Sequence, residues 1–462
     1  MMSKSWSGQR VLIVGAARQG LALARFLSRQ GAEVTLNDQR SAAQLEAAVK
    51  SMADFKVKWA MGGHPSSLLN KTDLVCVSGG VPLKLSLVTE AQRKGIPISN
   101  DSQIFMEAVP CKVVGITGSA GKTTTTTLVG RMAQAAIKPP QKAWIGGNIG
   151  LPLIDQVDQM SPDDLVILEL SSFQLELMTS APQVAAILNI TPNHLDRHGT
   201  LAAYIAAKAR ILTFQTENSV AVLGREDPGA WGLSRQVRGR LVTFSFNRPQ
   251  EGQVGTYLEK RKLYFYDGHY SKEILPQEMV RLRGDHNLAN VLGACAIAHA
   301  CGMNIDAMVT GVAGFTGVAH RLEFVRMWRG AAWYNDSIAT APERTTAAIH
   351  SFNEPLILLL GGRDKDLPWE DLAELIHQRV DHVILFGEAA VKVNKAIGPL
   401  VSGQRPYTLS VFPGLQQAVQ AAADLAEPGD VVLLSPGGTS YDEFQDFEER
   451  GERFRQWVQQ LS

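Results

Sequence analysis

Cysteine is scarce in this sequence of 462 residues. Its four cysteines, Cys76, Cys111, Cys295 and Cys301, include no CxxC pair. Such a set argues against a disulfide framework or a zinc cluster and favours core thiols in a reducing compartment. Long apolar runs are also lacking, and the opening "MMSKSWSGQRVLIVG" does not resemble a signal peptide. We therefore expect a cytoplasmic protein without a membrane partner.

Net charge is absent as well, because 45 basic residues balance 45 acidic ones. This balance gives no general attraction to nucleic acid or to anionic membranes, so an anionic ligand must be held by a local site. With 45% hydrophobic and 19% charged residues, the composition is that of a globular protein with sizeable cores. The length predicts about three domains.

Strand and helix patterns divide the chain into three α/β blocks, residues 1–100, 101–317 and 318–462. Short apolar runs such as "RVLIVG", "DLVILELSS" and "PLILLLGG" alternate with helical patterns, which predicts parallel sheets. In the second block, "LVTFSF" and "TYLEKRKLYFYDG" resemble antiparallel strands, and a helix is expected from about Asn287 to Gly302. The third block begins with a predicted hairpin, "LEFVRMWRGAAWYND".

The first block contains only a partial dinucleotide fingerprint. "GAARQG", from Gly15 to Gly20, lacks the middle glycine of GxGxxG, so it gives little support to an oxidoreductase. Asp38 ends the next strand, where a doubly wound fold often binds a ribose or base. A carboxylate that only ends the strand and caps a helix is an equal alternative.

The second block contains a phosphate-binding loop of a short form, "GSAGKT". The longer pattern needs a glycine where this chain has Ile116, but an apolar strand precedes the loop and a helical segment follows it. Backbone amides at such a helix start favour an anion, while Lys122 reaches outer phosphates and Thr123 binds Mg²⁺. The alternative is a glycine turn with an exposed lysine. For Thr125 to Thr127 we expect local packing or backbone hydrogen bonds.

Four further polar residues raise a chemical interpretation that must be weighed against an ordinary one. Glu169 ends an apolar strand and is either an acid facing the metal or a solvated terminus. Lys208 lies among alanines in "YIAAKARIL" and, without other information, resembles a surface lysine with a buried stem. His194 and His198 are four apart, but Pro192, Gly199 and the missing glutamate exclude a zincin helix.

Taken together, the motifs resemble the Mur ligase family over essentially the whole chain, and within it the D-glutamate-adding members. In family order they are "TGSAGKT", "GGNIG", "ELSSFQLE", "NITPNHLDRH", "YIAAKARIL", "GDHNLAN", "FTGVAHRLE", "NDSIAT" and "LLSPGGTSYDEF". The resemblance implies a Rossmann-like N-terminal domain for a UDP-sugar, a central P-loop ATPase-type domain, and a Rossmann-like C-terminal domain that brings the amino acid.

The implied reaction is an ATP-dependent ligation that requires Mg²⁺. ATP phosphorylates the alanyl carboxylate of UDP-N-acetylmuramoyl-L-alanine, and the amine of D-glutamate attacks the acyl phosphate, as a step of peptidoglycan precursor synthesis. Phosphorylation turns a poor electrophile into one with a leaving group. The resemblance also favours a monomer.

Residue roles follow from the matching positions. The implied catalytic residues are Lys122, Glu169, His194 and Lys208, the last of them carbamylated by CO₂. The implied ATP contacts are Gly118, Ser119, Gly121, Lys122, Thr123, Thr124, Asn287, Asn290, Arg321 and Asp336. The implied metal ligands are Thr123 and Glu169 at a first Mg²⁺ and His194 and Lys208 at a second. The implied UDP-sugar contacts are Arg18, Gln19, Asp38, Gln39, Arg40, Ser78, Asn148 and His194. The implied D-glutamate contacts are Thr340, Lys365, Ser440 and Phe447.

The chain departs from the family pattern at several positions. Ile338 stands where the family has a lysine, so one charged contact to the amino acid or phosphate is missing. "SGG" at residues 78–80 and "SPGGTS" at 435–440 also differ, but their glycines can retain the turns. Gln19 and Gln39 replace more common residues at the UDP positions.

Alternatives remain at the level of function. A related ligase that adds a different amino acid, or a folylpolyglutamate synthase, would share most of these motifs. A nucleotide-dependent switch would also use the P-loop, but it would need no second substrate pocket. Asp336, Thr340, Lys365 and Ser440 predict such a pocket here.

Overall fold

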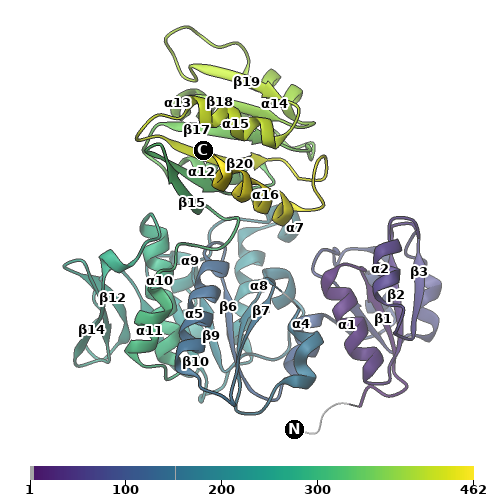
Figure 1. The fold of residues 1–462 in the computed structure, drawn as a ribbon. Helices are drawn as coiled ribbons and strands as arrows, with labels where there is room; N and C mark the ends of the chain where they lie inside the picture. The colour runs from purple at the N-terminus through teal and green to yellow at the C-terminus, as the bar shows by residue number, and fades with distance from the viewer. Residues whose placement is uncertain (1–4, 151) are drawn as a thin grey trace. The chain divides into compact units, whose positions relative to one another are not determined.

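The computed structural model describes residues 5–150 and 152–462, which form three sheets with helices packed against them (Figure 1). The chain divides into two compact units. One contains residues up to Val280 together with Asp285–Phe315, and the other contains Arg281–Gly284 and Thr316–Ser462. The first unit holds two of the sheets and the second holds the third. The predicted α/β fold is confirmed, while the domain boundaries at residues 100 and 317 stay a prediction.

The first sheet has five parallel strands in the order β3-β2-β1-β4-β5. The order reverses between β1 and β4, so the crevice outside their carboxyl ends is where such a fold binds its ligand. The strands are β1 (Arg10–Val14), β2 (Glu33–Asp38), β3 (Val57–Met61), β4 (Leu74–Val77) and β5 (Ile98–Ser99). The helices are α1 (Arg18–Arg29), α2 (Glu46–Ser51), η1 (Ser66–Lys71), α3 (Ser86–Arg93) and α4 (Asp101–Ala108).

The second sheet has nine strands in the order β14-β13-β12-β11-β10-β9-β6-β8-β7. Its strands are β6 (Lys112–Thr117), β7 (Ala143–Gly147), β8 (Leu165–Glu169), β9 (Val184–Ile187), β10 (Val220–Gly224), β11 (Arg240–Phe244), β12 (Val254–Glu259), β13 (Lys262–Tyr266) and β14 (Ser271–Pro276). Its helices are α5 (Lys122–Ala136), η2 (Leu153–Gln159), α6 (Ser172–Leu175), α7 (Leu195–His198), α8 (Leu201–Thr213), α9 (Pro228–Trp231), η3 (Ser234–Gln236), η4 (Gln277–Met279), α10 (Asp285–Ala300) and α11 (Ile305–Val312).

Strand direction in the second sheet corrects one prediction. The hairpin of β12 and β13 is antiparallel, as expected from "TYLEKRKLYFY", and β14 extends it. The prediction for "LVTFSF" was wrong, because β11 runs parallel to both β10 and β12. Its residues alternate between apolar and polar types in a way that suits either direction, so the connections to neighbouring strands decide it.

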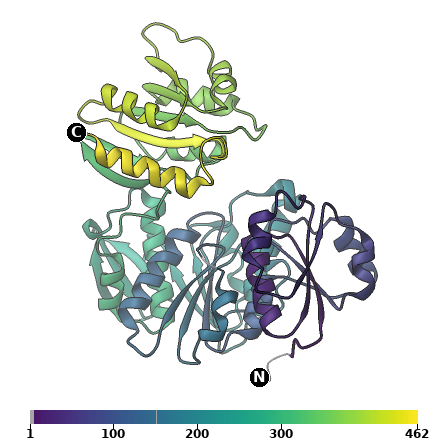
Figure 2. The same cartoon turned by 45° about the vertical axis from the view of Figure 1, so that its right-hand side comes forward.

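The third sheet has the order β15-β16-β20-β17-β18-β19 and begins with the predicted antiparallel hairpin of β15 and β16. Central strands such as β17 are buried along their whole length, which is typical of a parallel sheet covered on both faces. Helix α16 lies along this sheet in Figures 1 and 2 and contacts β15 and β16. The strands are β15 (Glu323–Trp328), β16 (Ala331–Asn335), β17 (Leu356–Gly361), β18 (His382–Phe386), β19 (Thr408–Phe412) and β20 (Val431–Gly437). The helices are α12 (Pro342–Ile349), α13 (Glu370–Arg379), α14 (Ala390–Ile397), α15 (Leu415–Leu425) and α16 (Phe447–Gln460).

The hydrophobic cores follow the division into two units. One continuous cluster of buried side chains extends from Trp6 to Leu233 and joins the first sheet to the second. The third sheet has a separate cluster on each of its faces. Within the described residues, the search for a helix with the length and apolarity to span a bilayer finds no candidate.

Asp164 generates a prediction about stability. Its carboxylate, in a residue only 4% exposed, accepts hydrogen bonds from Lys142 N (2.8 Å), Ser161 N (3.0 Å) and Trp144 Nε1 (2.8 Å). We expect Asp164→Ala to lower the unfolding free energy by about 3 kcal/mol, because it removes three charge-assisted hydrogen bonds at once. Denaturant titration and calorimetry measure the change. Asp163→Ala is the control, because Asp163 is the exposed neighbour. Equal unfolding midpoints for the two variants would contradict the stabilising role of Asp164.

Candidate functional site

The loop between β6 and α5 has the backbone geometry of an anion site. Gly121, the N-cap of α5, has φ of 78°, and Lys122 begins the helix. The first amides of this helix are free of intrahelical acceptors and favour a negatively charged ligand. A side chain at Gly121 would place its Cβ 2.1 Å from Asn290 Oδ1, so only glycine allows the helix α10 to pack this closely.

Two lysine amines converge on the same loop. Lys122 Nζ donates to the carbonyl oxygens of Gly118 (2.9 Å) and Ser119 (3.2 Å). Lys208 Nζ, from α8, donates to the same Gly118 oxygen (2.9 Å) and to Thr117 Oγ1 (3.4 Å). The two predicted catalytic lysines therefore lie together although 86 positions separate them.

Lys208 is buried, contrary to the interpretation as a surface lysine. It is 1% exposed, and its amine lies 4.7 Å from the centre of the Tyr204 ring. Burial lowers the pKa of the Lys208 amine to about 6; the charge of Lys122 adds to this effect, and Glu169 opposes it. The amine is therefore mostly neutral at pH 7.

Glu169 is also buried, at 1% exposure, so the interpretation as a solvated strand end is wrong. It ends β8, beside β6, and its Oε1 accepts a hydrogen bond from Asn148 Nδ2 (3.1 Å). Its Oε2 is buried without a hydrogen-bond partner. A buried carboxylate oxygen of this kind requires a cation or a donor, and it therefore fits a divalent metal beside the loop.

The remaining predicted nucleotide residues of the first unit lie on the elements around this cluster. Ser119 Oγ contacts Thr191 O (2.9 Å) and Tyr204 OH (3.1 Å), Asn290 Nδ2 donates to Asn287 Oδ1 (3.2 Å), and Thr123 and Thr124 lie in the first turn of α5. His194 is the N-cap of α7, with its ring 6.4 Å from that of Tyr204. Among the side chains that the structure describes, no three His, Cys, Asp or Glu residues form a metal cluster by themselves.

Most side chains of the threonine run after Lys122 pack in the protein interior. Thr125 and Thr126 are fully buried, and their hydroxyls have no hydrogen-bond partner. Thr127 Oγ1 donates to the Thr123 carbonyl (2.8 Å). The prediction of packing or backbone hydrogen bonding is confirmed for these three residues.

The predicted UDP-sugar residues of the first sheet lie around the carboxyl ends of β1, β2 and β4. Asp38 accepts hydrogen bonds from Ala16 N (2.8 Å) and from the backbone and guanidinium of Arg40. The side-chain hydrogen bonds of Arg40 hold the pKa of the Asp38 carboxyl well below its usual range. Ser78 Oγ donates to Gly15 O (2.9 Å), Arg18 begins α1 with Gln19 after it, and Gln39 is exposed. Asp38 thus ties the first loop together rather than capping a helix.

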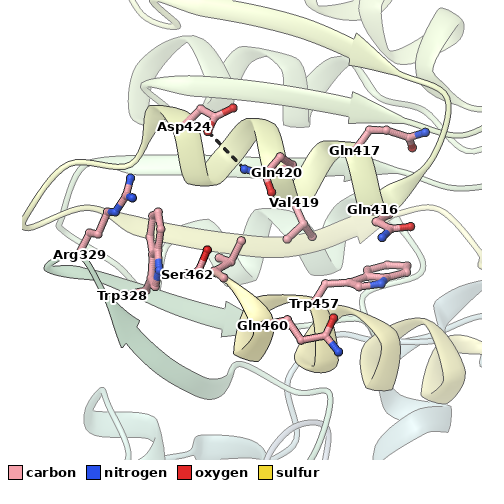
Figure 3. Close-up of a pocket in the computed structure, with 11 residues that line it drawn as sticks. Trp328, Arg329, Gln416, Gln417, Val419, Gln420, Asp424, Trp457, Gln460 and Ser462 are labelled. Carbon is pink, nitrogen blue, oxygen red and sulfur yellow. Dashed lines mark hydrogen bonds between the residues drawn. The ribbon is translucent and has the colours of Figure 1, made fainter.

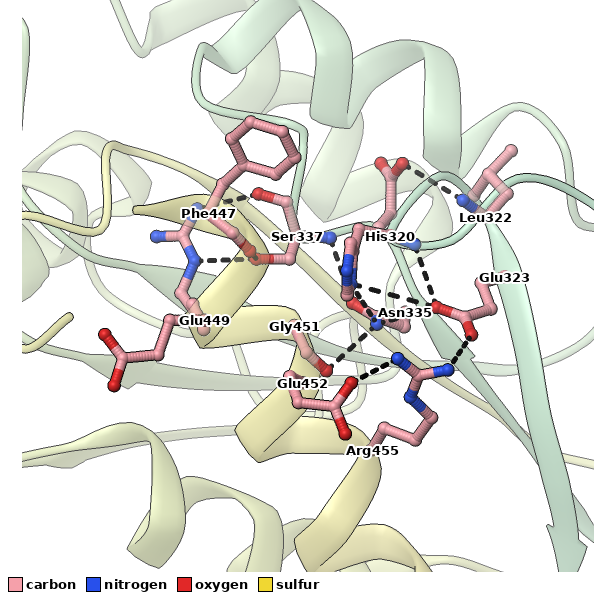
Figure 4. Close-up of polar contacts among 12 residues, drawn as sticks. His320, Leu322, Glu323, Asn335, Ser337, Phe447, Glu449, Gly451, Glu452 and Arg455 are labelled. Carbon is pink, nitrogen blue, oxygen red and sulfur yellow. Dashed lines mark hydrogen bonds and ion pairs between the residues drawn. The ribbon is translucent and has the colours of Figure 1, made fainter. Parts of the chain in front are cut away.

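The predicted amino-acid residues lie together in the second unit. Lys365 Nζ donates to Thr340 Oγ1 (3.3 Å). The backbone of Thr439, beside Ser440, exchanges hydrogen bonds with Arg363, and Gly437 N donates to Ala339 O, so three loops meet at one edge of the sheet. Phe447 starts α16, and its carbonyl accepts from Ser337 Oγ (2.8 Å; Figure 4).

A buried polar network supports the other predicted residues of this unit. Asn335 Nδ2 contacts Glu323 Oε2 (3.0 Å), His320 Nδ1 (3.1 Å) and Gly451 O (3.1 Å), as Figure 4 shows. The contacts of Asn335 with His320 and Glu323 hold the turn that contains Arg321. Asp336 accepts from Ser435 Oγ (2.9 Å) and Leu322 N (3.2 Å), and burial raises the pKa of its carboxyl to about 7.

Two residues escaped the sequence interpretation. Tyr204 lies one helical turn before Lys208, and this spacing was a usable signal. Arg450 is fully buried and donates to Ser337 Oγ, Ser337 O and Gly438 O, which joins two loops of the predicted amino-acid site. Nothing in the charged stretch "FEERGERF" distinguishes this arginine from its solvated neighbours.

A further hollow in the second unit contains none of the predicted site residues. It lies among α15, the end of α16 and the β15–β16 turn, and has a volume of about 450 Å³ (Figure 3). Its lining residues are Trp328, Arg329, Gln416, Gln417, Val419, Gln420, Asp424, Trp457, Gln460, Leu461 and Ser462.

Gly121 generates a prediction about nucleotide binding. We expect Gly121→Ala to weaken ATP affinity by about 100-fold or more. The new methyl group collides with Asn290, and the backbone at this position is left-handed, which alanine disfavours. Titration calorimetry with ADP or ATP measures the loss. Gly293→Ala, on the same helix as Asn290 and with only ordinary contacts at 3.5 Å, should retain affinity. Equal affinity in both variants would contradict the proposed loop geometry.

In a comparison with known proteins, family models match segments of all three sheets. Family models described as "Mur ligase MurD-like, N-terminal domain", "Mur ligase middle domain" and "Mur ligase, glutamate ligase domain" match residues 9–100, 116–298 and 320–438. Two solved structures from Thermotoga maritima have the same fold at 17% identity: UDP-N-acetylmuramate-alanine ligase MurC (TM-score 0.57, covering 97% of this chain and 99% of that one) and MurF ligase in complex with ADP (TM-score 0.54, 99% and 96%).

Sequence relatives match over their full length. The UDP-N-acetylmuramoylalanine--D-glutamate ligase of Koribacter versatilis is 38% identical over 456 residues, 98% of each chain. The protein of the same name from Pelotomaculum thermopropionicum is 37% identical over 461 residues, 100% of this chain and 99% of its own. Matches of this extent, to a chain that also carries the P-loop and the buried lysine, show that it belongs to the Mur ligase family.

Proposed function

We propose that this chain is an ATP-dependent ligase that adds D-glutamate to UDP-N-acetylmuramoyl-L-alanine in peptidoglycan precursor synthesis. The names of its full-length relatives support the choice of substrates. The observation that carries the reaction type is the convergence of Lys122, Lys208 and Glu169 on the P-loop. We further propose that the enzyme acts in the cytoplasm as a monomer.

The P-loop and its lysine account for the first half of the reaction. Helix-start amides of α5 and the Lys122 amine bind the outer phosphates of ATP, where Lys122 exchanges its carbonyl contacts for phosphate oxygens. A carboxylate oxygen of the UDP-sugar substrate attacks the γ-phosphorus, the bond to ADP breaks, and an acyl phosphate forms. Positioning and charge neutralisation provide most of the rate enhancement in such transfers.

The amine of the incoming amino acid completes the reaction. It attacks the acyl carbon, inorganic phosphate leaves with the bonding electrons, and the amine loses a proton as the amide forms. In this proposal Thr340, Lys365, Ser440 and Phe447 bind the amino acid, and the nucleotide also contacts Arg321 and Asp336. A lysine and two hydroxyls suit a ligand with two carboxylates.

Magnesium fits the residues that surround Glu169. Thr123 and Glu169 would hold a first ion, and His194 and Lys208 would hold a second. The ions would neutralise charge on the transferred phosphoryl group. The orphaned Glu169 Oε2 supports this assignment. Because Mg²⁺ usually takes only one or two protein carboxylates and completes its shell with water and phosphate oxygens, the small ligand set is sufficient.

Carbamylation would supply the second carboxylate of that set. A neutral amine is the form that attacks the carbon of CO₂, and after losing one proton it becomes an anionic carbamate. Burial keeps Lys208 largely neutral at pH 7, so the modification does not first require an unfavourable deprotonation. The carbamate would place negative charge beside the metal instead of an amine.

Amino-acid dependence tests the proposed substrates. Purified protein with ATP, Mg²⁺ and UDP-N-acetylmuramoyl-L-alanine should release phosphate with D-glutamate and much more slowly with L-glutamate, L-alanine or a diamino acid. Mass spectrometry should detect the D-glutamyl product. Release with another amino acid but not with D-glutamate would instead support a different Mur-type ligase, and activity only with a folate acceptor would support a folylpolyglutamate synthase.

Lys208 generates a prediction about rescue. We expect Lys208→Ala to lose at least about 100-fold in kcat, because the metal loses a ligand, and to recover part of it with formate or acetate, which replace the carbamate carboxylate. The wild-type protein should gain nothing from these acids. Unaltered activity of Lys208→Ala without additives would remove this lysine from the site.

A further inference from the structure

The first turn of α12, which follows the loop from Asp336, contains a cation that no sequence motif identified. Arg344 is the third residue of α12, and its Nη1 donates back to the carbonyl oxygen of Ile338 at 3.2 Å. The same oxygen accepts from Thr340 N at 2.9 Å. The Arg344 guanidinium therefore lies against the turn formed by residues 338–340, which is the turn that carries Thr340.

A second cation reaches this turn from another loop. Lys365 Nζ donates to Thr340 Oγ1 at 3.3 Å, so the amine and the guanidinium lie on the same short segment. Burial lowers the pKa of Lys365, and the charge of Arg344 is the next contribution in the same direction. Two positive charges thus lie close enough to disfavour each other.

Within the described part of the chain, no ion pair joins Arg344 or Lys365 to a carboxylate. Arg363, two residues before Lys365, does form an ion pair with a carboxylate, that of Glu388, at 2.8 Å. The two cations at the turn therefore lack a carboxylate within ion-pair distance, although Glu343 lies near enough to favour the charged form of Lys365. A dianionic ligand would remove their repulsion.

Fold stability gives no reason for an arginine at this position. A positive charge in the first turn of a helix opposes the helix dipole, and residue 344 lies in that turn of α12. The side chain is exposed, so it contributes no core packing. Its guanidinium, in contrast, presents a planar set of donors that matches a carboxylate.

We propose that Arg344 binds a carboxylate of the incoming amino acid and supplies the positive charge that Ile338 does not. This inference rests on the proposed function, because it assigns a specificity-determining residue to the amino-acid pocket of that ligase. Lys365 and Arg344 then each face one carboxylate of a dicarboxylic amino acid, held at the turn of Thr340.

Steady-state kinetics of Arg344→Ala and Arg344→Gln test the assignment. We expect the KM for D-glutamate to rise by about 10- to 100-fold, the range for losing a charge-assisted hydrogen bond. The KM values for ATP and for the UDP-sugar should remain within about twofold. Arg379→Ala is the matched control, because its guanidinium also donates to one backbone carbonyl, that of Phe352, at 2.7 Å. It should change none of the three constants.

A second substitution tests the replacement of charge directly. Ile338→Lys in the Arg344→Ala background should lower the KM for D-glutamate again, by at least about fivefold, since a lysine there restores a cation at the turn. Arg344→Ala with an unchanged KM for D-glutamate would overturn the proposal. An equal rise in all three KM values, or no rescue by the lysine, would overturn it as well.

The substrate assay and the Arg344 kinetics can fail independently of each other. If the wild-type protein ligates D-glutamate and Arg344→Ala behaves like wild type, only this inference fails. If the protein uses another dicarboxylic amino acid, the proposed function fails and the same kinetics with that amino acid still decide the role of Arg344. A protein that uses only amino acids with a single carboxylate would overturn both.

Discussion

Two lysine amines share one acceptor, the carbonyl oxygen of Gly118, and the geometry of the central site depends on this contact. It draws α8 to the loop that precedes α5 and brings Lys208 within the field of both Lys122 and Glu169. Neighbouring ammonium groups in a buried place resist simultaneous protonation. The loop therefore holds the Lys122 amine, which the proposed function assigns to phosphate, beside the Lys208 amine, which is mostly neutral at pH 7.

Much of the fold was predictable because parallel strands covered on both faces leave a strong apolar pattern, as in "PLILLLGG". The direction of β11 was not, since "LVTFSF" has the same composition in either orientation and its pairing depends on distant connections. Helix and strand positions around the P-loop followed from the glycines and the apolar strand before them. The division into two compact units depends on shared cores that no local pattern reveals.

The site was predictable only where residue type and spacing imply chemistry. The P-loop lysine and threonine satisfy that condition, whereas Glu169 and Lys208 had bland interpretations that only burial excludes. Family resemblance, not the residues alone, selected Lys208. Arg450 could not be identified, because a buried guanidinium that joins two loops looks in sequence like any arginine of a charged helix. Arg344 escaped for another reason, because a single exposed arginine at the start of a helix belongs to no motif.

The separate cores of the second unit have an evolutionary consequence. Since the amino-acid residues, their supporting network and two apolar clusters all belong to one compact unit, substitutions there perturb packing that the nucleotide loop does not share. Effects of changes in independent cores tend to add rather than to couple. Under the proposed function, evolution can therefore change the proposed amino-acid residues while the core around the P-loop stays intact.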